Sequence, residues 1–185
     1  MNATATVRRI DNLGRIVIPK EIRRTLRIRE GDSLEILVDY QGEVILKKYS
    51  PISELGEFAK EYTDSLYEAL GHIACITDRD QVIAVSGGPP KEFLNKRISG
   101  IVKKIMEDRK AVLITQSAQR FCSTIFEGEK GAGRYLAEVI APIIAEGDPF
   151  GAVIIVSKSP NTKFGDLELK SAVTAASFLA KQMEQ

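Results

Sequence analysis

The chain has 185 residues, with 26 basic and 25 acidic side chains and 44% hydrophobic residues, a composition typical of a soluble globular protein. No apolar run reaches the roughly 18 to 20 residues that cross a bilayer, and the N-terminus lacks a signal-peptide core, so we expect a cytoplasmic protein without a membrane partner. The even overall charge conceals an asymmetry, because residues 1–30 carry eight basic and three acidic side chains. This segregation predicts that the N-terminal part of the chain meets a polyanion.

The first residues predict two short strands. Residues 4–10 alternate loosely between polar and apolar side chains, and residues 15–18 are apolar after Arg15. Between them lies the sequence Asp11-Asn12-Leu13-Gly14, which is typical of a turn. Pro19 then suits the first position of a helix, because its missing N–H would be unpaired there in any case.

A short helix and a hairpin are expected to complete this small domain. Ile22 and Leu26 are four residues apart and share the inner side of the helix, with arginines pointing away. Residues 33–39 and 43–48 then predict two strands joined by a turn. A domain of about 48 residues buries little of its surface, so we expect it to pair with a second copy whose strands close its sheet edges.

Three motifs in this segment carry a resemblance to a known family. They are Arg8-Arg9-Ile10-Asp11, the run from Leu13 to Arg23, and Glu30-Gly31-Asp32. Through them, residues 5–50 resemble the swapped-hairpin DNA-binding domain of the AbrB family of bacterial transition-state regulators. The resemblance implies a homodimer of intertwined hairpins, a small β-barrel, that presents the arginines of both chains on one side.

The resemblance also implies which side chains contact double-stranded DNA. In the family, DNA contacts are attributed to arginines at the positions of Arg8, Arg15, Arg23 and Arg24, and the neighbouring Arg9 and Lys20 could assist. Guanidinium groups bind both phosphates and guanine edges, so the sequence leaves open which arginines position the protein and which read bases. The alternative, a merely solvated surface, is disfavoured because the charge is one-sided and coincides with a specific motif.

Residues 50–53 form a junction, since Pro51 stops the preceding strand pattern. Residues 54–70 then predict an amphipathic helix whose apolar residues are spaced by three and four. Those residues are Leu55, Phe58, Ala59, Tyr62, Leu66, Ala69 and Leu70.

The remainder of the chain, residues 71–185, predicts an α+β domain with an antiparallel sheet covered by terminal helices on one face. The expected strands are residues 73–77, 82–85, 112–114, 121–126, 135–145 and 150–157, and the expected helices are residues 91–95, 99–108 and 164–183. For the last helix we expect an apolar side formed by Leu167, Val173, Ala176, Phe178 and Leu179.

Residues 141–157 resemble the closing hairpin of GAF sensor domains. GAF domains often hold a small molecule on the open face of the sheet, so the resemblance implies a regulatory effector, whose identity stays open. Candidate residues of an effector pocket are the polar or aromatic ones on short strands and loops, namely Ser86, Phe93, Phe121, Arg134 and Tyr135. The alternative is that these residues fill a core and that the domain serves only for oligomerisation.

The sequence offers little for catalysis. His72 is the single histidine, and Cys75 and Cys122 stand apart in apolar surroundings typical of buried thiols. The glycines of residues 127–134 do not match dinucleotide or phosphate-loop spacings, and no spacing suggests a metal site. We therefore expect a protein without enzymatic activity and without a metal or cofactor.

Together with the basic N-terminal segment, the AbrB resemblance implies a bacterial transcription regulator that binds double-stranded DNA at the nucleoid, activating some promoters and repressing others. Dimers are expected to pair into homotetramers through the helices at residues 54–70 and 164–183. The alternative is an antitoxin-like interaction module, since toxin-neutralising proteins share the N-terminal fold. Those proteins usually end in a short unstructured tail, whereas this chain continues into a globular domain.

Overall fold

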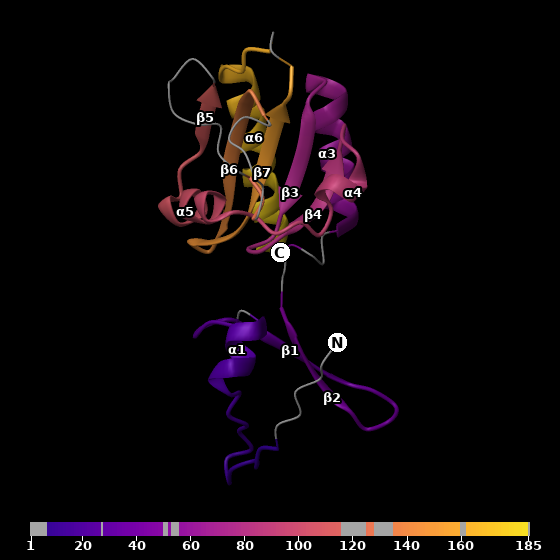
Figure 1. Cartoon of the computed structure of the whole chain (residues 1–185), viewed down its shortest axis with the longest axis vertical. Helices are drawn as coiled ribbons and strands as arrows, with labels where there is room; N and C mark the ends of the chain where they lie inside the picture. The colour runs from indigo at the N-terminus through magenta and orange to yellow at the C-terminus, as the bar shows by residue number, and fades with distance from the viewer. Residues whose placement is uncertain are drawn as a thin grey trace. The chain divides into compact units, whose positions relative to one another are not determined.

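A computed structural model of the chain describes residues 7–26, 28–49, 52, 56–115, 125–127, 135–159 and 162–184. The chain divides into two compact units, Met1–Tyr49 and Ser50–Gln185, and each is described by itself (Figure 1). Within the described ranges, no helix combines the length and apolar character that a membrane span requires.

Within its described residues, the N-terminal unit contains one short helix and one hairpin. Helix α1 (Lys20–Leu26) begins directly after Pro19, whose carbonyl accepts a hydrogen bond from the Arg23 amide at 2.9 Å. Strands β1 (Leu34–Val38) and β2 (Val44–Lys48) pair antiparallel, with Leu34 opposite Lys48. The helix and the hairpin are confirmed.

The N-terminal unit has no core of its own, since none of its described residues is buried. The strands expected at residues 4–10 and 15–18 are wrong for the described residues, because residues 7–10 and 15–18 are not in a strand, and residues 4–6 lie outside the described ones. A strand needs a partner, and β1 and β2 pair with each other. Its exposed large apolar side chains include Val7, Ile10, Leu13, Ile16, Val17, Leu26, Ile36, Val38, Val44, Ile45 and Leu46.

The C-terminal unit is built on a five-stranded antiparallel sheet in the order β4-β3-β7-β6-β5. This confirms the predicted α+β class. The strands are β3 (Ile73–Thr77), β4 (Val82–Ser86), β5 (Val112–Thr115), β6 (Ala137–Ala145) and β7 (Asp148–Ser157).

Helices cover both faces of this sheet (Figure 1). Helix α3 (Gly56–Leu70) and helix α6 (Asp166–Met183) lie on one face over a core that includes Ile76, Val139 and Leu179. Helices α4 (Pro90–Phe93) and α5 (Gly100–Asp108) belong to a second core on the other face. Of the strand expected at residues 121–126, Phe126 forms an isolated bridge to Ile98, and residues 121–124 lie outside the described ones.

The apolar side expected for α6 is only partly correct. Ala176 and Leu179 are buried, but Leu167, Val173 and Phe178 are 65%, 43% and 39% exposed. The helix instead buries mainly alanines, which let its backbone approach the sheet closely and leave the larger side chains outside. Phe58 of α3 is likewise exposed.

Candidate nucleic-acid interface

The six basic residues predicted to contact DNA lie in three segments of the N-terminal unit. Arg8 and Arg9 belong to the stretch before the first turn, Arg15 ends that turn, and Lys20, Arg23 and Arg24 lie on α1. All six side chains are exposed. Their burial in a core of this unit is therefore excluded.

The turn that ends at Arg15 is held by Asp11. The Asp11 amide donates to the Arg15 carbonyl at 3.1 Å, and the Gly14 amide donates to the Asp11 carbonyl at 3.0 Å. Gly14 has a φ of 77°, a conformation that favours glycine. The Asp11 carboxylate accepts from the Leu13 amide at 2.9 Å and from the Arg15 amide at 2.8 Å, and Arg15 Nε donates to it at 2.8 Å. These bonds from Arg15 lower the pKa of Asp11, with that from the Arg15 amide as the largest cause.

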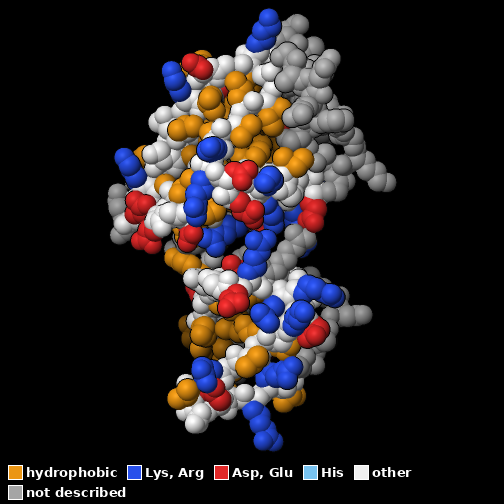
Figure 2. Space-filling view, turned by 90° about the vertical axis from the view of Figure 1, so that its left-hand side faces the viewer, with side chains coloured by type: hydrophobic (Ala, Val, Ile, Leu, Met, Phe, Trp, Pro, Cys, Tyr) orange, Lys and Arg blue, Asp and Glu red, His pale blue; other side chains and the backbone are white. Residues whose placement is uncertain are grey.

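Electrostatic partners of the other basic residues are scarce. Of the six basic side chains, only Arg15 has an acidic partner within the described parts of the chain. The positive charges on Arg8, Arg9 and α1 are therefore open to an external anion. Figure 2 shows basic and hydrophobic side chains next to one another on the visible face of the N-terminal unit. Exposed guanidinium groups of this kind suit bidentate binding of phosphate oxygens.

The predicted effector residues do not form one group. Phe93 and Tyr135 are buried in the second core with ring centroids 6.5 Å apart. Ser86 points to the opposite face of the sheet, where its hydroxyl donates to Asp64 at 2.6 Å and lies 2.9 Å from the Thr63 hydroxyl on α3. Strand alternation explains the separation, since Ser86 shares its face with Ala84 of the first core. Phe121 and Arg134 lie outside the described residues.

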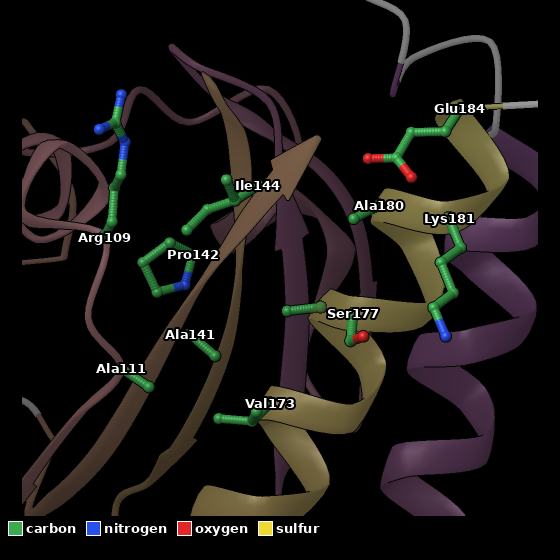
Figure 3. Close-up of a pocket in the computed structure, with 11 residues that line it drawn as sticks. Arg109, Ala111, Ala141, Pro142, Ile144, Val173, Ser177, Ala180, Lys181 and Glu184 are labelled. Atoms are coloured by element: carbon green, nitrogen blue, oxygen red, sulfur yellow. The ribbon is translucent and has the colours of Figure 1, made fainter. Parts of the chain in front are cut away.

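The structure contains a pocket that was not predicted. Its volume is about 420 Å³, and it lies between α6, β6 and the segment that leads into β5 (Figure 3). Small side chains on facing elements, such as Ala141 and Ala180, leave this space unfilled. The abundance of small residues was the feature of the sequence that could have indicated a pocket here. None of the predicted effector residues is among its lining residues, which are Arg109, Ala111, Ala141, Pro142, Ile144, Val173, Ala176, Ser177, Ala180, Lys181 and Glu184.

The described residues supply no arrangement for catalysis or metal binding. His72 is half-buried with its ring centroid 4.8 Å from that of Phe164. Cys75 is buried, and desolvation raises the pKa of its thiol far above the usual range. No group of three or more His, Cys, Asp or Glu residues suited to a metal occurs in the described ranges.

Comparison with known proteins identifies the family. Residues 54–184 match the family described as "Stage V sporulation protein T C-terminal, transcription factor". The chain is also 56% identical to "Stage V sporulation protein T" of Bacillus subtilis (strain 168) over 185 residues, which is 100% of both chains. The chain belongs to the stage V sporulation protein T family.

Both halves of this member of the stage V sporulation protein T family have further relatives. Residues 7–54 match the family described as "Antidote-toxin recognition MazE, bacterial antitoxin". A 51-residue segment, 28% of this chain, is 59% identical to "Transition state regulatory protein AbrB" of B. subtilis (strain 168) and covers 52% of that protein. The predicted AbrB resemblance is thereby confirmed.

The fold of the C-terminal unit also has counterparts among solved structures. The GAF domain of an Acinetobacter phosphoenolpyruvate-protein phosphotransferase superposes with a TM-score of 0.59 at 15% identity, covering 72% of this chain and 88% of that one. At this identity the likeness concerns the fold alone, and it confirms the predicted GAF-like architecture.

Proposed function

We propose that this protein is a DNA-binding regulator of sporulation genes, which activates some promoters and represses others. The observation that carries the proposal is the exposed basic surface of the N-terminal unit, formed by Arg8, Arg9, Arg15, Lys20, Arg23 and Arg24. Its charges suit the phosphate backbone of a duplex. Membership of a family described as a transcription factor supports the same reading.

The DNA-binding form is a homodimer. The N-terminal unit leaves its large apolar side chains exposed and buries none of its described residues, a state that a domain of this size does not maintain alone. A second copy supplies the missing partner, with the hairpins of the two chains intertwined in a small barrel. The dimer then presents two sets of the six basic residues to one duplex.

The GAF-like unit joins dimers into a tetramer. Phe58 of α3 is 50% exposed and lies one turn from Tyr62, whose ring centroid is 5.3 Å from that of Phe178 on α6. This apolar patch consists of the exposed Phe58 and Phe178 and the half-buried Tyr62, and it bridges the two helices that carry it. Contact between copies of the patch removes its apolar surface from water.

The GAF-like unit also provides the regulatory input. We place a small-molecule effector site on the sheet face that packs against the second core, which contains Phe93 and Tyr135. A small molecule seated against this face changes the packing of α4 and α5 on the sheet. No role in effector binding is assigned to Ser86, whose hydroxyl is engaged on the other face.

The proposal is tested by binding of the full-length protein to genomic promoter fragments. An Arg23→Ala, Arg24→Ala double variant should fold, because both side chains are exposed, and should lose most of the affinity. A matched control is the Lys104→Ala, Lys110→Ala double variant, which removes the same charge from exposed positions of the C-terminal unit. Equal binding by the two double variants would contradict the proposal.

The second candidate function is an antitoxin-like protein-interaction module. The match of residues 7–54 to a bacterial antitoxin family favours it. In this candidate function, the N-terminal unit serves mainly to bind a partner chain. It gives no role to the folded unit Ser50–Gln185. Absence of wild-type DNA affinity at low salt would favour this candidate over the regulator.

A further inference from the structure

Two turns of the N-terminal unit have the same pattern of hydrogen bonds. In residues 11–15, the first amide donates to the last carbonyl at 3.1 Å, and the Asp11 carboxylate accepts from two backbone amides at 2.9 and 2.8 Å. In residues 39–43, the corresponding backbone bond is 3.1 Å, and the Asp39 carboxylate accepts from two amides at 2.9 Å each. Gly14 and Gly42 occupy the fourth position with φ of 77° and 82°.

The two turns differ in their fifth residue. In the first turn that residue is Arg15, whose Nε donates to Oδ2 of Asp11 at 2.8 Å. In the second turn it is Glu43, which has the same sign of charge as Asp39 and cannot form this ion pair. One carboxylate oxygen, Oδ1, builds the turn in both cases. The other oxygen of Asp11 is therefore not needed for the turn and serves to hold the arginine side chain.

We propose that Asp11 is a positioning residue of the DNA-binding surface, which fixes the guanidinium group of Arg15 in the orientation that binds DNA. The inference rests on the proposed function of that surface. Arginine presents five N–H donors. Because only Nε is used by Asp11, the four N–H groups on the terminal nitrogens stay available for a phosphate or a guanine edge.

The negative charge of Asp11 distinguishes this inference from one based only on charge attraction between the protein and DNA. A carboxylate beside a DNA-binding arginine repels phosphates, so a surface optimised only for attraction would lack Asp11. Arg15 remains 70% exposed in the pair, so its guanidinium is oriented without being covered. An ordered arginine loses less side-chain freedom on binding than a free one. The proposal therefore requires that the gain from orientation exceeds the repulsion.

The test is Asp11→Asn in the full-length protein. Asparagine keeps Oδ1 for the two backbone amides but replaces Oδ2 with an amide nitrogen, which cannot accept a bond from Arg15. Asp39→Asn is the matched control, because it makes the same charge change in the same kind of turn without an arginine. Thermal unfolding of both variants checks that each turn persists.

We expect Asp11→Asn to weaken binding to a selected promoter fragment by about tenfold, corresponding to about threefold for each of two copies. Asp39→Asn should bind as tightly as the wild type or more tightly. In an Arg15→Ala background, Asp11→Asn should no longer weaken binding, because its effect acts through that arginine. This coupling is a readout that a merely structural role of Asp11 would not produce.

Two results would overturn the inference. One is an Asp11→Asn variant that binds the promoter fragment as tightly as the wild type. The other is an equal loss of binding in the Arg15→Ala background, which would make Asp11 a turn-forming residue only. If the wild type itself binds no DNA, the proposed function fails instead, so the two failures are distinguishable.

Discussion

The proposed tetramer depends on Phe178, which links α6 to α3 at the surface through its contact with Tyr62. Replacement by glutamate should separate the tetramer into dimers. An aromatic side chain of about 200 Å² that is 39% exposed leaves about 80 Å² per copy open to solvent. Burial of two copies in a symmetric contact contributes about 4 kcal/mol at about 25 cal/mol per Å². Its loss raises the dissociation constant by about a thousandfold.

Light scattering at micromolar concentration measures this change. The matched control is Val173→Glu, since Val173 is similarly exposed on the same helix but lines the pocket of Figure 3. We expect the wild type and Val173→Glu to be tetramers and Phe178→Glu to be a dimer. A wild type that is only dimeric, or a Phe178→Glu variant that stays tetrameric, would refute the reasoning.

Two further predictions concern the stability of the GAF-like unit. Gly151→Ala places a Cβ 1.9 Å from a carbonyl oxygen of β3, so urea unfolding should show a destabilisation of about 3 kcal/mol. In the control variant Gly100→Ala, the new Cβ meets no atom within 4 Å, so its stability should be unchanged or higher. Hydrogen bonds from Lys60 and Ser86 hold the pKa of Asp64 below 3.8, so this carboxylate contributes stability above that pH, which is lost as the pH falls below it. Ser86→Ala should therefore reduce the loss of stability between about pH 4 and pH 2, and an unchanged loss would contradict this linkage.

Much of the fold follows from local sequence patterns. The helix after Pro19, the hairpin around Gly42 and the strands of the GAF-like sheet were predicted from turn residues and periodicity. The two strands expected before Pro19 do not form in the described residues, and under the proposed dimer their partner strands belong to the second copy. The exposure of Phe178 and Leu167 depends on how closely an alanine-rich helix approaches the sheet, which periodicity does not specify.

The candidate sites could likewise be predicted only in part from the sequence. The exposed arginines and the lysine were predictable, because a one-sided basic segment with a specific motif is a local property of the sequence. The proposed role of Asp11 was not, since it depends on which atom of the carboxylate faces Arg15. Ser86 was grouped with Phe93 because both are polar or aromatic residues of the short strands and loops, but the bulge in the pairing of β3 with β4 makes alternation hard to follow from sequence.

The most direct test of the DNA-binding account is the salt dependence of binding to a promoter fragment. Two chains that each offer about four contacts should give a slope of about −5 to −7 in log K against log salt concentration. Removing Arg23 and Arg24 from both chains takes away four cations, and the slope should fall in magnitude by about 3 to 4. A shallow wild-type slope, or the same steep slope in the folded double variant, would contradict the assignment of this surface to DNA.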